Sequence, residues 1–296
     1  MPYETSHHFD SVCIIESLAL PDDLTGTSLY NDVLKPLADR EGFMVRHYAA
    51  DTRNLFFDAF QHIRHDFVQQ GHGPINHIEA HGDEDHTGIV LASGEMITWE
   101  ELRVILTEIN IAVQFNLLLV MALCSGWWLS SILLPSQPWP VWGIVGPTET
   151  VGDRDLKQAM AAFYREMFHS YDARKAMDQA NDQRPYEDWT YRLETADLLF
   201  CRAFRHHMEI MTDAELQERL NWIVAENFRV YPDRKRSAAV REWARGQLLQ
   251  HEKHYNQVKR QFLMLDRFPG NEKRFPLRYE DCKGHGAQPS DTTSPQ

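Results

Sequence analysis

The 296-residue chain has few cysteines and lacks the paired cysteines of common metal and disulfide frameworks. Its four cysteines lie far apart, with no Cys-x-x-Cys pair, at Cys13, Cys124, Cys201 and Cys282. Zinc fingers and ribbons use such pairs, and small disulfide-stapled domains use a dense cysteine framework. We therefore expect neither a structural zinc site nor a disulfide scaffold, and we expect a reduced, cytoplasmic setting.

The chain also lacks an excess of positive charge. It contains 30 Lys and Arg residues against 43 Asp and Glu residues, a net charge of −13 at pH 7. A non-specific nucleic-acid binder needs a basic surface that displaces phosphate counterions, so this class is disfavoured. Residues 1–184 hold 12 basic and 26 acidic side chains, whereas residues 185–296 hold 18 and 17. This asymmetry predicts two regions with different roles.

A signal peptide is not expected, because the first ten residues lack a basic start and a long apolar run. Residues 117–134 are almost wholly apolar, which is typical of a membrane span or of a buried strand that leads into a buried helix. Ser125-Gly126 interrupts this run, and the nearest charged residues are Glu108 and Glu149 rather than Lys or Arg. These features favour the buried strand and helix over a membrane segment.

Short apolar runs alternate with segments of helical periodicity over the first 180 residues. The predicted strands are residues 12–15, 43–48, 75–80, 117–123 and 141–145, with a hairpin formed by residues 88–91 and 95–97. Helices are predicted at residues 25–40, 51–70, 127–133 and 155–168, and another helix is predicted to start at Thr98. Thr25 and Asp51 are the predicted N-caps of the first two, and Thr98 forms a predicted capping box with Glu101. This alternation predicts an α/β fold, a three-layer α/β/α sandwich around a mainly parallel sheet.

The pattern changes after residue 184. Residues 189–208, 213–228 and 237–268 have the periodicity of long helices, with no convincing strand between them. We therefore expect an α/β domain over residues 1–184, an all-helical C-terminal region over residues 185–283 and a disordered polar tail over residues 284–296. The helical region could brace the α/β domain, or it could recruit a partner or a second copy of the chain.

Two of the predicted strands end in potentially reactive residues. The strand at 75–80 leads into His81-Gly82, and the strand at 117–123 leads into Cys124. In parallel sheets, ligands bind beyond the carboxyl ends of the strands, so both residues would lie at one edge of the sheet. His81 could take the thiol proton of Cys124, and the N–H groups of Gly82 and Cys124 could stabilise an oxyanion. A following helix would favour the thiolate.

The segments HIEAHGDEDHTGIVLASGEMITWEEL and NLLLVMALCSGWW resemble the caspase-like cysteine peptidases, particularly the CHAT branch related to separase. That family has a strand ending in His-Gly, a glycine-marked hairpin and a strand ending in Cys-x-Gly. The resemblance covers about residues 10–180 and implies a catalytic dyad of His81 and Cys124, with Gly82 at the oxyanion hole. The resemblance also implies limited cuts in a protein substrate, often in cell-death or defence pathways. We expect no cofactor.

The chain departs from the family where specificity is set. Residues 122–126 read Ala-Leu-Cys-Ser-Gly, not the Gln-Ala-Cys-x-Gly of animal caspases, and metacaspases have Asp where Ala122 stands. Substrate preference is therefore not transferred. The acidic balance of residues 1–184 favours a basic residue before the cut bond. Candidate substrate-binding carboxylates near the expected cleft are Glu79, Asp83, Glu149 and Asp153. Each could equally be a solvated or structural group, and Glu79 could also orient His81.

Two other functions compete with the peptidase hypothesis. Five side chains within ten residues could bind a metal in a hydrolase: His77, His81, Asp83, Asp85 and His86. Their order does not match a His-x-His-x-Asp-His motif, because position 79 is Glu, and the next histidine is His169. We therefore expect no metal site. The other alternative is an inactive caspase-like scaffold that binds partners through its helical region.

Overall fold

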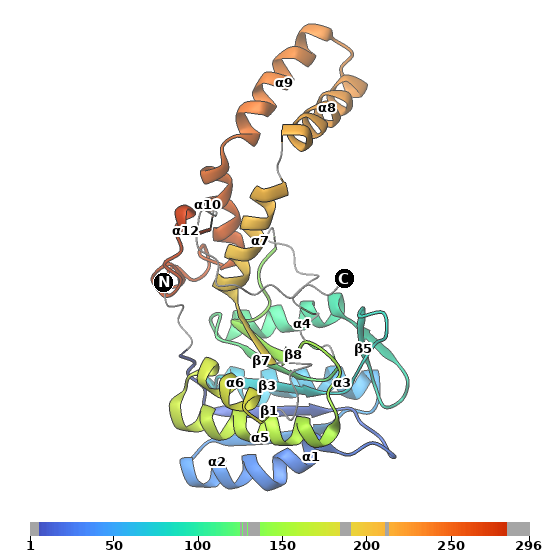
Figure 1. The fold of residues 1–296 in the computed structure, drawn as a ribbon, viewed down its shortest axis with the longest axis vertical. Coiled ribbons are helices and arrows are strands. Elements are labelled where there is room, and N and C mark those ends of the chain that lie inside the picture. The colour runs from blue at the N-terminus through green and yellow to red at the C-terminus, as the bar shows by residue number, and fades with distance from the viewer. Residues whose placement is uncertain are drawn as a thin grey trace.

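A six-stranded sheet in the order β2-β1-β3-β7-β8-β9 forms the centre of the computed structural model (Figure 1). The structure describes residues 6–124, 126, 129, 137–183, 191–210 and 213–282. The strands are β1 (Ser11–Glu16), β2 (Met44–Ala49), β3 (Pro74–Glu79), β7 (Leu118–Ala122), β8 (Gly143–Pro147) and β9 (Tyr191–Thr195). The first five in chain order run parallel, and β9 runs antiparallel to β8. All five strands predicted for this sheet are confirmed.

The burial of these strands explains their sequences. Every residue of β1, β3, β7 and β8 is buried, as in a parallel sheet covered on both faces. Strands β1, β7 and β8 are therefore apolar along most of their length, whereas β3 contains the buried polar residues Asn76, His77 and Glu79. Strand β2 lies at the edge and keeps several side chains partly or fully exposed. Within the described part of the chain, no helix is long and apolar enough to cross a membrane. The uncharged stretch between Glu108 and Glu149 instead contains the interior strands β7 and β8.

Helices cover both faces of the sheet and complete the predicted α/β/α sandwich (Figure 1). One layer contains α1 (Thr25–Leu29), the π-helical turn η1 (Tyr30–Leu34), α2 (Lys35–Glu41), α5 (Asp153–Ser170) and α6 (Ala173–Asn181). The other layer contains α3 (Arg53–Asp66), the short 3-10 turn η2 (Val68–Gln70) and α4 (Trp99–Ala112). The sequence did not predict α6. The helix predicted at 127–133 lies outside the described residues, apart from Leu129.

The helix caps test the sequence predictions at single residues. Helix α4 begins with the predicted capping box between Thr98 and Glu101. The two other predicted caps are wrong, because α1 and α3 have Leu24 and Thr52 at their N-caps. Thr25 lies inside the first turn of α1, and its hydroxyl donates to the buried carboxylate of Glu79 instead.

A second, antiparallel sheet stands at the carboxyl ends of the main strands. It consists of β4 (His81–Gly82), β5 (Gly88–Val90) and β6 (Met96–Thr98), so the predicted hairpin is confirmed. The chain leaves the main sheet after Glu79, and His81 pairs with Val90 of β5. His81 and Gly82 are therefore held by the hairpin rather than by a continuation of β3.

The all-helix prediction after residue 184 is wrong at its start. Residues 191–195 form β9, which pairs with β8 from Gly143–Thr195 to Pro147–Tyr191. The main sheet thus takes its edge strand from beyond the boundary predicted at residue 184, because β8 offers an unpaired edge that only a tertiary partner can fill. The helix predicted at 237–268 is two helices, α9 (Arg234–Leu248) and α10 (His251–Phe262).

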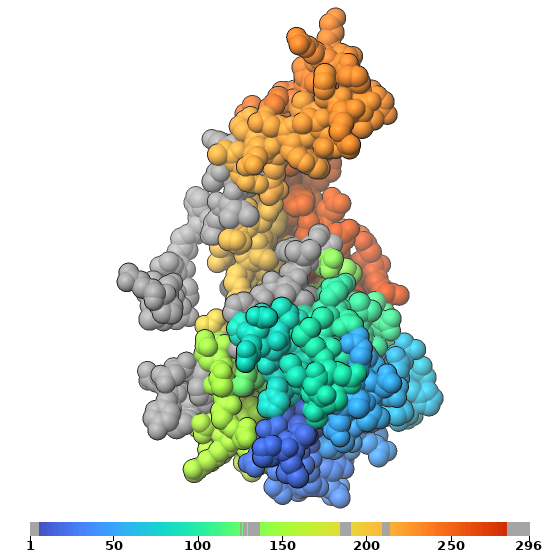
Figure 2. All heavy atoms as spheres, turned by 90° about the vertical axis from the view of Figure 1, so that its right-hand side faces the viewer, coloured from blue at the N-terminus to red at the C-terminus, as the bar shows by residue number. Residues whose placement is uncertain are grey.

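The C-terminal helices form two structurally different parts. Helices α7 (Ala196–Ile210), α10, α11 (Asn271–Arg274) and α12 (Tyr279–Cys282) continue the core, with Phe200 packed on Phe262 and Phe204 packed on Tyr255. Helices α8 (Asp213–Val230) and α9 instead project away from the sandwich as a hairpin (Figures 1 and 2). A separate small cluster holds them together, with Leu216, Leu220 and Ala244 buried.

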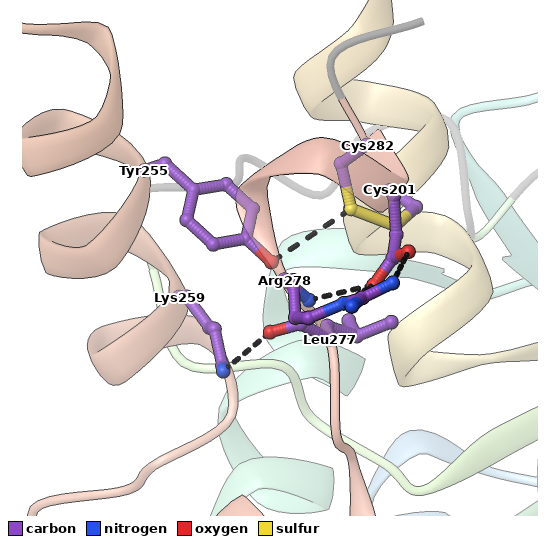
Figure 3. Close-up of a disulfide and its surroundings, with 7 residues drawn as sticks. Cys201, Tyr255, Lys259, Leu277, Arg278 and Cys282 are labelled. Carbon is purple, nitrogen blue, oxygen red and sulfur yellow. Dashed lines mark hydrogen bonds and ion pairs between the residues drawn. A yellow bond between two sulfur atoms is a disulfide. The ribbon is translucent and has the colours of Figure 1, made fainter.

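One disulfide joins Cys201 on α7 to Cys282 on α12 (Figure 3). The expectation of reduced cysteines is therefore wrong for this pair, which is separated by 81 residues and has no recognisable spacing in the sequence. Cys13 and Cys124 are free. The cytoplasmic setting stays a prediction, and the predicted tail at 284–296 lies outside the described residues.

Candidate active site

The two predicted motifs meet beyond the carboxyl ends of β3 and β7. These strands are adjacent and parallel, with Glu79 opposite Ala122, so the segments that follow them leave the sheet at the same edge. The side chains of both motifs line one small cavity of about 40 Å³. Its lining residues are Leu18, Thr25, Ala80, His81, Ala122, Leu123, Cys124, Val151, Asp153 and Leu156.

The glycines of the two motifs permit a very close approach of backbone segments. A Cβ atom on Gly82 would lie 2.3 Å from the carbonyl oxygen of Cys124, far inside van der Waals contact. A Cβ atom on Gly126 would lie 2.7 Å from the Cβ atom of Met121 and 2.8 Å from its carbonyl oxygen. Only glycine therefore fits at either position without movement of the backbone. The close approach of Gly82 to the carbonyl group of Cys124 brings the His-Gly and Cys-x-Gly segments together.

His81 and Cys124 are both accessible to solvent. The His81 side chain is 53% exposed, and its Nε2 atom lies 2.9 Å from Oδ2 of Asp22. Cys124 is partly exposed, in contrast to Cys13, which is buried and whose thiol has its pKa raised by burial. Sequence reasoning missed Asp22, because it precedes His81 by 59 residues and lies in an irregular segment with no motif.

Glu79 is a buried part of a hydrogen-bond network. Its side chain is 1% exposed and accepts a hydrogen bond from the Thr25 hydroxyl. It also lies 2.8 Å from Nε2 of His77. The other ring nitrogen of His77 is 2.9 Å from the hydroxyl of Tyr164, whose pKa is raised by burial. These contacts agree with the structural role that the sequence left open for Glu79.

The histidines of the alternative metal site are not brought together. His77 is buried and bonded to Glu79 and Tyr164, whereas His81 is half exposed and bonded to Asp22. Among the described residues, no three His, Cys, Asp or Glu side chains are placed to hold a metal ion.

A second buried carboxylate, Glu16, lies beside Glu79 and was not predicted. It accepts hydrogen bonds from the N–H groups of Gly26 and Thr27, at 2.7 and 3.1 Å, and from the Thr27 hydroxyl at 2.6 Å. His47 completes its shell at 2.8 Å. Burial alone would raise the pKa of Glu16, but the hydrogen bonds from His47 and Thr27 together lower it. Glu16 thereby anchors the N-terminus of α1 at the edge of the site.

The other acidic candidates lie in different surroundings. Asp153 begins α5 and lines the cavity. Asp83 closes the turn before β5 and accepts from the hydroxyl and N–H of Thr87, and the hydroxyl bond is the main cause of its lowered pKa. Glu149 is exposed. Of the four candidates, all in the described part of the chain, Asp153 is the one that lines the cavity.

Comparison with known proteins adds a distant structural likeness. No family model and no curated protein matches the chain. Among solved structures, the chain is similar to the crystal structure of the Drosophila initiator caspase Dronc, with 13% sequence identity and a TM-score of 0.47. The match covers 65% of this chain and 82% of that chain. At this distance, the likeness says nothing of substrate or of individual residues.

Proposed function

We propose that the protein is a cysteine endopeptidase of the caspase-like kind that makes limited, sequence-selective cuts in a protein partner. The observation that carries this proposal is the contact of Gly82 with the carbonyl group of Cys124, together with the single cavity that His81 and Cys124 line. A nucleophile, a base and two backbone N–H donors can act on one carbonyl group only when their segments converge in this way.

The proposed reaction uses the dyad in two steps. The thiol proton of Cys124 passes to His81, and the sulfur attacks the carbonyl carbon of the substrate. The N–H groups of Gly82 and Cys124 stabilise the resulting oxyanion. His81 then protonates the leaving amine as the C–N bond breaks, which leaves a thioester on Cys124. Water, deprotonated by His81, hydrolyses the thioester and releases the acid.

The proposed substrate preference rests on the net charge of residues 1–184. The excess of acidic residues in the sandwich favours a basic side chain, Arg or Lys, before the cut bond. Asp153 is the candidate contact for such a side chain, and its position in the lining of the cavity supports this role. Asp83, Glu149 and Glu79 remain weaker candidates, and Glu79 already has two partners within the protein. Membership of the CHAT branch, and a role in cell death or defence, are part of the same proposal.

The projecting hairpin of α8 and α9 supports a recruiting role for part of the C-terminal region. It buries few of its own side chains and exposes Trp222 and Trp243, which are 67% and 65% accessible. Exposed tryptophans of this kind are typical of protein–protein contacts. The packing of α7 and α10 into the main core supports the bracing role for that part of the region.

The direct test identifies cut sites by proteomics after incubation with active enzyme or with Cys124→Ala. Both Cys124→Ala and His81→Ala should abolish cleavage while leaving the unfolding transition unchanged. Cleavage by either variant at the wild-type rate would refute the dyad. Chelators should not change the rate of hydrolysis.

A substrate-free test separates a peptidase from an inactive scaffold. Iodoacetamide should alkylate Cys124 much faster in wild type than in His81→Ala, because a neighbouring base generates the thiolate. Cys13 serves as an internal control, since it is fully buried and burial raises the pKa of its thiol. A scaffold cysteine would react at a rate that does not depend on His81.

A further inference from the structure

Asp22 is the hydrogen-bond partner of the proposed catalytic base. Its Oδ2 atom lies 2.9 Å from Nε2 of His81, across 59 residues of sequence. The Asp22 side chain is 36% exposed, so it forms part of the open rim of the site rather than of the core. Since Nε2 is engaged by Asp22, the other ring nitrogen of His81, Nδ1, is left for the reaction.

The segment that carries Asp22 is held at both ends. The backbone N–H group of Asp22 donates to the carbonyl oxygen of Ala19 at 2.9 Å. Three residues after Asp22, α1 begins with a turn that is fixed by the buried carboxylates of Glu16 and Glu79. The position of Asp22 is thus restrained by a local turn on its N-terminal side and by buried carboxylates on its C-terminal side.

We propose that Asp22 is the positioning residue of the His81–Cys124 dyad. This inference rests on the proposed peptidase function. The Asp22 carboxylate accepts the N–H of Nε2, which fixes the neutral imidazole in the tautomer whose lone pair is on Nδ1. That lone pair takes the proton of the Cys124 thiol, and the resulting imidazolium is stabilised by the Asp22 carboxylate. Asp22 keeps its negative charge throughout, and the same proton passes from Nδ1 to the leaving amine.

A neighbouring carboxylate provides the control. Asp23 is the next residue, but its carboxylate is bonded to Lys157 at 3.1 Å. Asp23→Asn removes one negative charge from the same neighbourhood without removing the partner of His81. It separates the effect of the specific hydrogen bond from the effect of the general negative charge beside His81. Asp153 is not used as a control, because it lines the cavity with Cys124 and is a candidate substrate contact.

The experiment measures the rate of alkylation of Cys124 by iodoacetamide from pH 5 to pH 9, in full-length protein, by mass spectrometry of the Cys124 peptide. Loss of a hydrogen-bonded opposite charge typically shifts the pKa of the group that remains by about one unit. We therefore expect Asp22→Asn to raise the midpoint of the profile by about one unit and to lower the rate at neutral pH about tenfold. Asp22→Glu, which keeps the carboxylate, should retain most of the rate. Asp23→Asn should retain the wild-type midpoint.

The outcomes distinguish this inference from the proposed function. If His81→Ala slows alkylation but Asp22→Asn follows the wild-type profile, Asp22 has no positioning role and the dyad stands. An equal shift in Asp22→Asn and Asp23→Asn overturns the inference as well, because it reports only the general negative charge beside His81. If His81→Ala itself has no effect, the peptidase function fails.

Discussion

Glu16 and Glu79 are directly opposite each other on the parallel strands β1 and β3, and both carboxylates bind the first turn of α1. The turn is packed closely against them. A Cβ atom on Gly26 would lie 3.0 Å from Oε1 of Glu16 and 3.2 Å from the carboxyl carbon of Glu79. Two buried acidic groups at neighbouring positions are tolerated because hydrogen-bond donors surround both. They fix the segment between β1 and α1, which borders the site.

The first prediction concerns Glu16. Glu16→Gln should lower the free energy of unfolding at pH 7 by about 1–3 kcal/mol, because the amide group cannot accept all the hydrogen bonds of the carboxylate. The pKa of Glu16 is lowered in the folded state, so its stabilisation is complete above the unfolded pKa and is lost as the pH falls through the folded pKa. Urea unfolding of wild type and variant at pH 7 and pH 3 should therefore show a smaller difference at pH 3.

Glu100→Gln is the matched control for that measurement. Glu100 pairs with Arg103 on the surface of α4, and its side chain is 65% exposed. An exposed pair of this kind contributes at most about 1 kcal/mol. If Glu16→Gln has an effect as small as that of Glu100→Gln, the anchoring role of Glu16 is wrong.

The second prediction concerns Gly82. In Gly82→Ala the new methyl group would meet the Cys124 carbonyl, so the two segments must separate. We expect a loss of about 1–3 kcal/mol in the free energy of unfolding, and alkylation of Cys124 as slow as in His81→Ala. Gly152→Ala is the control, because nothing lies within 4 Å of its Cβ position. Equal alkylation rates in Gly82→Ala and wild type would show that the close contact is unimportant for the site.

The third prediction concerns the disulfide between Cys201 and Cys282. Replacement of both cysteines by Ala should lower the free energy of unfolding by about 2–4 kcal/mol, because the bond closes a long loop in the unfolded chain. Wild type should lose a similar amount on addition of a reducing agent, whereas the double variant should not respond. Detection of free thiols at both positions in non-reduced wild type would contradict the bond.

The fourth prediction concerns the hairpin of α8 and α9. Replacement of residues 213–249 by a short glycine–serine linker should leave the remaining protein folded, because the hairpin has its own small cluster of buried side chains. The linker can be short, since α7 and α10 are in contact through Phe204 and Tyr255. Alkylation of Cys124 and cleavage of a short peptide should persist, while cleavage of the protein partner should fall.

A truncation at residue 185 is the contrasting variant for the hairpin deletion. It removes β9, exposes the edge of β8 and uncovers the buried faces that α7 and α10 protect. We expect this variant to aggregate. A folded, soluble protein after this truncation would show that β9 and the bracing helices are dispensable.

The sequence by itself predicted the elements whose signals are local. Five strands of the main sheet, the hairpin of β5 and β6 and the capping box of α4 each depend on neighbouring residues, such as an apolar run or the pair Thr98 and Glu101. The order of these elements predicted which strand ends would meet, and the structure brings His81 and Cys124 to one cavity. Their catalytic role stays a prediction.

Tertiary structure decided the features that depend on pairs distant in the chain. Strand β9 has five residues, lies directly before α7 and pairs with the edge of β8. The disulfide joins Cys201 to Cys282, which are 81 positions apart. The hydrogen bond between Asp22 and His81 joins residues that are 59 positions apart. Each depends on where the folded backbone brings two side chains, and no periodicity or local propensity encodes such a distance.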